Sequence, residues 1–469
     1  MSPTRTMAAL LAVVGIACAV LALATSDGAR PASARADVGV RTAAWSARRV
    51  PQPIVDAVGA QRLQTALAEA LGATPACVVV DSGGAAIASI GSDVPLIPAS
   101  TQKILTVAVA LAVLGPDATL QTRAIAATAP VDGVVEKLFL VGGGDAQLGT
   151  PALQAEFDAV AETRGTKITP LATLADGIVA AGVKRIPGGI VADDSRYDGL
   201  RYLPTWRDSY RTDGQIGPVG ALTVDRGFRA FRPQPDPVED PGLYAVEQLT
   251  SMLAERGVTV GRSAGRGTAP AEGVEVATVA SAPISDIAAT ILRASDNLGS
   301  EMLLREIGVR VAQAGSTDAG ATALVAELGE LGIDPTGAVV VDGSGLDRGN
   351  RTTCGVLAAA LGLGSRPEFA ALWNGMPVAG QSGTLVDEFR GTPLDGKLRA
   401  KTGSLDGVTG LAGLLDVGRS LRFAFVANGA FTEQGGVDLR ARIAAVIATY
   451  PDAPPADTLV PRPDAAGTP

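Results

Sequence analysis

Histidine is absent from this chain of 469 residues, and lysine is rare. Only six of the 39 basic residues are lysines, and the others are arginines. A Ser-His-Asp hydrolase is therefore excluded, because the imidazole base is missing. A serine can still become a nucleophile when a neighbouring amine accepts its proton. The few lysines are thus the candidate bases of any serine chemistry in this chain.

Cysteine is scarce as well. Cys18 lies in an apolar N-terminal run, which leaves Cys77 and Cys354 in the remainder of the chain. Two thiols without histidine argue against a structural zinc site. In an oxidising compartment such a pair forms a disulfide if the two Cα atoms come within reach. The sequence does not decide between a Cys77–Cys354 bond and two separate buried thiols.

Positive charge is also in short supply. The net charge is −9, and the sequence has no cluster of lysine and arginine. Nucleic acid is excluded as a partner, since phosphate binding requires a basic surface. An apolar fraction of 47% and a length of 469 residues predict a globular protein of two or three domains.

The N-terminus has the pattern of an export segment. Arg5 is followed by an uncharged run over residues 7–25 and then by Asp27. Residues 1–26 are therefore predicted to be a signal peptide, with Ala22-Leu23-Ala24 as a cleavage site, or an uncleaved membrane anchor. Both alternatives place the rest of the chain outside the cytoplasm, either secreted or attached to the membrane.

The order of elements predicts an α+β fold whose antiparallel sheet draws strands from both ends of the chain. The evidence is a set of strand-like runs at residues 78–81, 85–90, 397–404, 408–415 and 421–428, with helical runs at 100–114, 284–293, 298–312 and 437–450. The expected organisation is a linker over 27–55, a main domain formed by 56–120 and 273–450, an inserted β-rich domain over 121–272, with strand-like runs such as 137–141, 189–192 and 222–231, and a disordered tail over 451–469.

Ser100 and Lys103 form the first candidate pair. They are three residues apart at the start of a predicted helix, so both side chains lie on one face. The apolar residues after Lys103 favour its neutral form by desolvation, and Lys401 is a candidate for a second cation with the same effect. The alternative is a helix cap followed by a surface lysine.

Ser295-Asp296-Asn297 is the second candidate block, in a short break between two predicted helices. From such a loop, Ser295 can transfer a proton from Lys103 to a departing amine, while Asn297 hydrogen-bonds the lysine and the substrate. The alternative is an N-cap of the second helix.

Lys401-Thr402-Gly403-Ser404 is the third block, on a predicted strand. The cation and the two hydroxyls can bind a terminal carboxylate, and Gly403 leaves room for a ligand near the backbone. The N–H groups of Ser100 and Ser404 can form an oxyanion hole. The alternative is an edge strand with a protective lysine. Each block alone favours its alternative, but three blocks in this order favour a lysine-activated serine hydrolase.

With these blocks in place, the chain resembles the class C low-molecular-mass penicillin-binding proteins, which are serine-type D-alanyl-D-alanine carboxypeptidases and endopeptidases of bacterial peptidoglycan. The likeness covers roughly residues 60–450 and extends to further segments: Gly142-Gly143-Gly144-Asp145, the run that ends at Leu304, Asp342-Gly343-Ser344-Gly345-Leu346 with Arg348 and Asn350, and Pro377-Val378-Ala379-Gly380 with Gly383-Thr384-Leu385.

The resemblance implies a penicillin-binding-protein/β-lactamase-like transpeptidase domain with an insert between the first two blocks. It also implies the roles of eight residues: Ser100 as nucleophile, Lys103 as general base, Ser295 and Asn297 in proton transfer, and Lys401, Thr402, Gly403 and Ser404 in substrate binding. Peptidoglycan stem peptides are then the substrates and β-lactams the covalent inhibitors. No metal or organic cofactor is expected.

Several points stay open at this stage. Asp145 and Arg348 are candidates for specificity contacts, with a turn and a salt bridge as equal alternatives. The gap between Ser100 and Ser295 is shorter than is usual in the family, which implies a reduced insert. A β-lactamase and a non-catalytic wall-binding protein of the same fold are the two rival functions. The long spacing between Lys103 and Ser295 disfavours the β-lactamase, and the complete set of catalytic side chains disfavours the binding protein.

Overall fold

The computed structural model of the protein describes residues 51–262 and 265–452. The predicted signal or anchor segment lies outside these residues, as do most of the linker and nearly all of the tail. No helix within the described residues is both long enough and apolar enough to cross a membrane.

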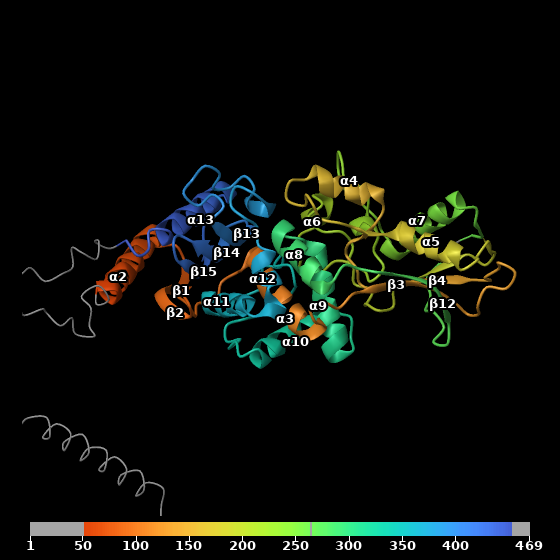
Figure 1. Ribbon diagram of the computed structural model, residues 1–469, viewed down its shortest axis with the longest axis horizontal. Helices are drawn as coiled ribbons and strands as arrows, with labels where there is room; N and C mark the ends of the chain where they lie inside the picture. Colours follow the sequence, from red (N-terminus) through yellow and green to blue (C-terminus); the bar gives the residue numbers. More distant parts are fainter. Residues whose placement is uncertain (1–50, 263–264, 453–469) are drawn as a thin grey trace, which may run out of the picture. The chain divides into compact units, whose positions relative to one another are not determined.

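A five-stranded antiparallel sheet forms the centre of the main domain (Figure 1). Its order is β13 (Leu398–Leu405), β14 (Val408–Asp416), β15 (Ser420–Asn428), β1 (Ala76–Ser82) and β2 (Ala85–Ile90). β1 pairs with β15 over six residue pairs, so strands from the two ends of the chain lie side by side. The predicted hairpin, the three C-terminal strands and the shared sheet are confirmed, and the fold is α+β.

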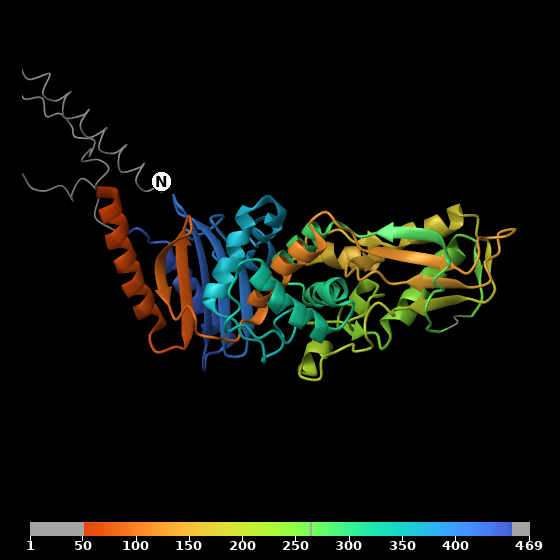
Figure 2. The same ribbon diagram turned by 90° about the horizontal axis from the view of Figure 1, so that it is seen from below.

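Helices cover both faces of this sheet, and alternating side chains supply the two cores. On β15, Phe423 and Phe425 pack toward α2 (Pro51–Leu71) and α13 (Glu433–Ile447). Figure 2 shows α2, in red, along one side of the sheet. Ala424 and Val426 point to the opposite core. The second face carries the remaining helices of the main domain: α3 (Lys103–Leu114), α8 (Ile284–Ala294), α9 (Asn297–Ala312), α10 (Thr317–Glu330), α11 (Cys354–Gly362) and α12 (Ala371–Asn374), with the short 3₁₀ turns η3 (Leu363–Ser365) and η4 (Pro367–Phe369). The 3₁₀ turn η5 (Gly383–Leu385) places Leu385 in the core shared with α2 and α13.

Two details at the start of the domain differ from the sequence expectation. Residues 51–55, assigned to the linker, belong to α2, whose Leu63, Leu67 and Leu71 are buried against the sheet. The predicted helix over 100–114 begins with a 3₁₀ turn, η1 (Ala99–Gln102), and only then continues as α3. Ser100 is therefore on the tighter turn and Lys103 is the first residue of the α-helix.

The inserted region has its own core, built on a four-stranded sheet in the order β12 (Val274–Ala280), β3 (Gln121–Ala126), β4 (Leu138–Val141) and β8 (Ile190–Asp193). β12 pairs with β3, so the sheet of the insert extends beyond the predicted boundary at residue 272. The other elements of the insert are α4 (Pro151–Ala159), α5 (Leu171–Ala180), α6 (Ser209–Thr212), α7 (Pro241–Glu255), η2 (Asp225–Gly227), β5 (Leu148–Gly149), β6 (Thr169–Pro170), β7 (Arg185–Ile186), β9 (Phe228–Ala230), β10 (Asp236–Pro237) and β11 (Thr259–Val260).

One strand expected in the insert is largely absent. The run over residues 222–231 has the composition of a strand, but only β9 is extended in this way. Before it, Asp225, Arg226 and Gly227 all have positive φ, at 49°, 56° and 75°. Composition could not reveal this turn, because aspartate and arginine seldom adopt the left-handed conformation.

Cys77 and Cys354 form a disulfide, with their Cα atoms 5.7 Å apart. Cys77 is on β1 and Cys354 begins α11, so the bond joins the sheet to a helix on its second face. Both residues are fully buried. The pairing that the sequence left open is thereby decided.

Candidate active site

The turn before α3 presents Ser100 to the amine of Lys103. Ala99 has a positive φ of 48°, which directs the chain from Pro98 into η1. The Oγ atom of Ser100 lies 2.9 Å from Nζ of Lys103. This is the contact that the three-residue spacing predicted, although it is made across a 3₁₀–α junction.

Lys103 is fully buried, and its amine is held by three oxygen atoms. Besides the Ser100 hydroxyl, Nζ donates to Oδ1 of Asn297 at 2.7 Å and to the carbonyl of Ser344 at 2.6 Å. Burial lowers the pKa of Lys103 from its usual 10.5 to about 8, against the opposing effects of the Asp342, Glu301 and Asp296 carboxylates. A neutral Lys103 can accept the Ser100 proton through the same 2.9 Å contact.

The break between α8 and α9 supplies the next two side chains. Ser295 ends α8 with a positive φ of 57°, and Asp296 caps α9 by accepting the N–H of Gly299 at 3.1 Å. The capping interpretation is thus correct for Asp296. It does not exclude a chemical role for the neighbouring residues, since Ser295 and Asn297 both line the cleft at Ser100.

Lys401 approaches the same point from β13. Its Nζ donates to Oγ of Ser295 and to the carbonyl of Thr402, each at 2.9 Å. Burial is the main cause that lowers the pKa of Lys401 well below its usual value, and the charges of Lys103 and Arg440 add to it. Lys103 is therefore hydrogen-bonded to Ser100 and Asn297, and Lys401 to Ser295, while Ser100, Ser295 and Asn297 all line the same cleft.

The remaining residues of the third block divide into two kinds. Thr402 and Ser404 line the cleft, and the Thr402 hydroxyl lies 3.0 Å from that of Thr384. Gly403 differs from the expectation. A Cβ atom at Gly403 would lie 2.7 Å from the carbonyl oxygen of Pro98, so the missing side chain lets β13 approach η1. The room at Gly403 is occupied by the turn that carries Ser100.

Two contributors to the site were missed by the sequence analysis. Arg440 of α13 donates to Oγ of Ser404 at 2.8 Å and also pairs with Glu388. The Ser344 carbonyl, which holds Lys103, belongs to the 342–346 segment. This segment contributes to the family resemblance, but the sequence predicted no role for it. The available sequence signal for Arg440 was its position on the apolar face of a predicted helix, three residues before Ile443 and seven before Ile447. A backbone carbonyl leaves no signal in the sequence.

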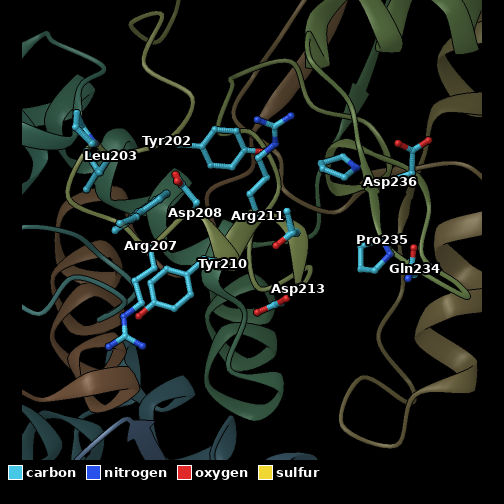
Figure 3. Close-up of a pocket in the computed structure, with 14 residues that line it drawn as sticks. Tyr202, Leu203, Arg207, Asp208, Tyr210, Arg211, Asp213, Gln234, Pro235 and Asp236 are labelled. Carbon is cyan, nitrogen blue, oxygen red and sulfur yellow. The ribbon is translucent and has the colours of Figure 1, made fainter.

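Ser100, Ser295, Thr402 and Ser404 line a cleft of about 520 Å³ between the main domain and the insert, which also contributes Gln215, Tyr210 and Asp213 to the lining. A larger pocket of about 1130 Å³ adjoins it and shares Arg207, Tyr210 and Asp213 with the cleft (Figure 3). The substrate of this site therefore has room to extend beyond the reacting bond.

Asp145 and Arg348 are not placed in the lining of the cleft. Oδ1 of Asp145 accepts the N–H of Gln147 at 2.8 Å, and burial raises the pKa of Asp145 to about 6. Nη1 of Arg348 donates to the carbonyl of Asp406 at 2.9 Å. The turn interpretation fits Asp145, and Arg348 bonds a carbonyl next to the Arg207–Asp406 ion pair.

Comparison with known families agrees with this geometry. The model of the D-Ala-D-Ala carboxypeptidase 3 (S13) family matches residues 60–236 and 234–450. The chain belongs to this family. It is accordingly a serine-type D-Ala-D-Ala carboxypeptidase, and the family predicted from the motifs is confirmed.

Relatives of the S13 family enzyme align over most of their length. The D-alanyl-D-alanine carboxypeptidase of Actinomadura sp. (strain R39) is 30% identical over 438 residues, which cover 76% of this chain and 78% of the relative. Carboxypeptidase DacB of Mycolicibacterium smegmatis is 33% identical over 468 residues, covering 92% and 95%. The crystal structure of penicillin-binding protein 4 from Haemophilus influenzae shares the fold, with a TM-score of 0.68 at 20% identity over 82% of this chain and 99% of that one.

Proposed function

We propose that this S13 family enzyme is an exported peptidoglycan DD-carboxypeptidase that removes the terminal D-alanine of stem pentapeptides through an ester on Ser100. The observation that carries the proposal is the 2.9 Å contact between the Ser100 hydroxyl and the buried amine of Lys103, which burial keeps partly neutral at physiological pH. The export segment predicted over residues 1–26, either cleaved or retained as an anchor, supports a site of action outside the cytoplasm.

In the acylation step, Oγ of Ser100 attacks the carbonyl carbon before the last D-alanine, and Lys103 accepts the hydroxyl proton. The backbone N–H groups of Ser100 and Ser404 are the proposed donors to the oxyanion. The C–N bond then breaks, and the departing amine receives a proton from the Ser295 hydroxyl. Ser295 in turn takes the proton that Lys103 accepted from Ser100. Asn297 holds the Lys103 amine in place during this transfer.

Binding of the terminal carboxylate is assigned to Thr402 and Ser404, with the amine of Lys401 behind them. Both hydroxyls face the cleft, and Arg440 fixes Ser404 by donating to its Oγ. After D-alanine leaves, a water molecule attacks the ester carbonyl, and Lys103 again accepts the proton. The ester C–O bond then breaks, and Lys103 returns this proton to Oγ of Ser100. Free Ser100 and the shortened peptide are then released.

Cleavage of cross-links is a second candidate activity of the same site. An endopeptidase differs from a carboxypeptidase in the size of the leaving group, and the adjoining 1130 Å³ pocket provides space for a larger one. β-Lactams, which resemble an acyl-D-Ala-D-Ala end, are the proposed covalent inhibitors. Penicillin-binding protein 4 of Haemophilus influenzae, which has the same fold, has been crystallised with a β-lactam.

Incubation of the protein with uncross-linked pentapeptide muropeptides and with cross-linked dimers, followed by mass analysis, tests both activities. We expect loss of one alanine from the pentapeptide, and Ser100→Ala should abolish it. Ser365→Ala, at an exposed serine on η3, is the matched control and should retain full activity. A pentapeptide left intact by the wild-type protein would refute the proposal.

Labelled penicillin separates the two rival functions. A carboxypeptidase should carry a persistent adduct on Ser100, whereas a β-lactamase would release hydrolysed penicillin rapidly and leave little adduct. The absence of both adduct and hydrolysis would favour a non-catalytic wall-binding protein.

A further inference from the structure

A strained turn of the insert reaches the catalytic loop between α8 and α9. Asp225, Arg226 and Gly227 are three successive residues with positive φ, and two of them are not glycine. Non-glycine residues adopt this conformation at an energetic cost and keep it only where the surroundings enforce it. Such strain in a turn that contacts a reacting site calls for a physical explanation.

The surroundings do enforce this turn. The Asp225 carboxylate accepts the N–H and the hydroxyl of Thr150, at 2.7 and 2.9 Å. On the other side, a Cβ atom on Gly217 would lie 2.0 Å from the carbonyl oxygen of Arg226, so the two backbones are in close contact. The conformation is thus fixed from both sides, and it aims the Arg226 side chain away from the core of the insert.

The guanidinium of Arg226 forms an ion pair with Asp296, the middle residue of the Ser295-Asp296-Asn297 block. The pair is largely removed from water, since the side chains are 18% and 3% exposed. A second contact from the insert lies beside it: the Gln215 carbonyl accepts Nδ2 of Asn297 at 2.8 Å. Because Oδ1 of Asn297 binds Lys103, the insert also orients the amide that holds the catalytic amine.

The charges around Lys103 explain why this pairing matters. The carboxylates of Asp342, Glu301 and Asp296 each favour the ammonium form of Lys103 and raise its pKa. Lys401 of β13 is a neighbouring amine, and its own pKa is lowered by burial and, to a smaller extent, by the charges of Lys103 and Arg440. Asp296 is the carboxylate of these three that forms an ion pair with an arginine.

We propose that Arg226 is a positioning residue of the active site, which holds the Ser295–Asn297 loop in place and neutralises the charge of Asp296 toward Lys103. The inserted region therefore contributes to proton transfer in the main domain as well as to the wall of the cleft. This inference rests on the proposed function, because it concerns the state of the amine that activates Ser100.

The test compares two replacements of Arg226 in the full-length protein. Arg226→Gln removes the charge but keeps a hydrogen-bond donor, whereas Arg226→Lys keeps the charge. The rate of Ser100 acylation by labelled penicillin is measured between pH 6 and pH 10 for each. Without the guanidinium, Asp296 stabilises the Lys103 ammonium more strongly, so the rising limb of the profile should move to higher pH.

For Arg226→Gln we expect a shift of about 0.5–1 pH unit, which corresponds to an acylation rate about three- to tenfold lower at pH 7. Arg226→Lys should keep the wild-type limb. Combining Arg226→Gln with Asp296→Asn should abolish the shift, because no carboxylate then needs a partner. A loss of packing alone would lower the rate without moving the limb.

Arg229→Met is the matched control. Arg229 is three residues away and pairs with Glu247 on the surface, where both side chains are about half exposed. This variant should retain the wild-type profile. If Arg226→Gln does not fold, Asp296→Asn is compared with the double variant. The Arg226 cation, which disfavours the Lys103 ammonium, is present only in Asp296→Asn, so the limb of this variant should lie about 0.5–1 pH unit below that of the double variant.

The possible failures can be told apart. If the wild-type protein forms no adduct, the proposed function is wrong. If the adduct forms and Arg226→Gln titrates as the wild type does, or if the two Asp296→Asn variants have the same limb, the role of Arg226 is wrong.

Discussion

The pH dependence of Ser100 acylation follows directly from the buried amine of Lys103. Burial lowers the pKa of Lys103 to about 8, so its neutral form makes up roughly one tenth of the population at pH 7 and about half at pH 8. Because the neutral form accepts the Ser100 proton, the acylation rate should rise with pH. We expect an increase of about tenfold from pH 6 to 7, about fivefold from 7 to 8 and less than about twofold from 8 to 9.

Replacement of Glu301 tests the same pH dependence at a second residue near Lys103. This glutamate is fully buried on α9, where its Oε1 accepts the N–H of Ser344, the residue whose carbonyl holds Lys103. Burial, with a smaller effect of Asp342, raises the pKa of Glu301 to about 8. Glu301 is therefore largely protonated at pH 7, and Glu301→Gln replaces a neutral acid with a neutral amide that keeps the same acceptor.

We expect Glu301→Gln to acylate within about twofold of the wild-type rate below pH 7, where Glu301 is already uncharged. Above pH 8, ionised Glu301 favours the Lys103 ammonium in the wild type, so the variant should reach its plateau at lower pH. Glu301→Ala, which leaves the Ser344 N–H without its acceptor, should be slower at every pH.

The assay is a time course with labelled penicillin in overlapping buffers from pH 6 to 10, together with thermal unfolding at each pH. The sign of the stability effect is also fixed. A carboxyl whose pKa is raised in the folded state stabilises it at low pH and loses this effect as pH rises from about 4.5 to 8. Wild-type stability should fall relative to Glu301→Gln over that range. A rate that is flat from pH 6 to 9 would refute the assignment of Lys103 as the base.

Three further predictions concern the supports of the site. Arg440→Met should raise KM for a pentapeptide more than it lowers kcat, which steady-state kinetics measures; an unchanged KM would contradict the role of Ser404. The variant should also lower the free energy of unfolding by about 1–3 kcal/mol in thermal unfolding, because Glu388 loses its partner. Gly403→Ala should lower the free energy of unfolding by about 1–3 kcal/mol and slow Ser100 acylation, because the new Cβ atom meets the Pro98 carbonyl. A variant with wild-type stability in thermal unfolding would contradict the close contact between β13 and η1. Under oxidising conditions, Cys354→Ala should lower the free energy of unfolding in denaturant by about 2–5 kcal/mol. In reductant, the variant and the wild type should have the same stability; a remaining difference would indicate an effect of packing instead of the disulfide.

The sequence predicted those parts of the fold that depend on local patterns. The β1–β2 hairpin and strands β13 to β15 alternate or are bounded by glycine turns, and their structural bounds differ from the predicted ones by only a few residues. The order of elements along the chain predicted one sheet shared by both chain ends, but not that β1 pairs with β15. α2 was missed because its Ala- and Pro-rich start resembles the preceding linker, although Leu63, Leu67 and Leu71 lie four residues apart on one face.

The sequence also predicted the eight proposed site residues, because short motifs identify them, but it could not predict what surrounds them. The partners of Lys103 include a backbone carbonyl at Ser344, 241 residues away in the chain. Arg226 reaches Asp296 through a turn whose conformation is unusual for its residues. These contacts depend on the tertiary packing of distant segments, for which a single sequence carries no direct signal.

The arrangement of charge explains why this site uses lysine and retains buried acids beside it. Burial alone would lower the pKa of Lys103 further, while Asp342, Glu301 and Asp296 oppose it. Protonation of Glu301 and pairing of Asp296 with Arg226 each weaken that opposition. A base with a pKa near the working pH is both available to accept a proton and able to return it, as acylation and deacylation require in turn. An arginine at position 103 could not serve, because its guanidinium stays protonated.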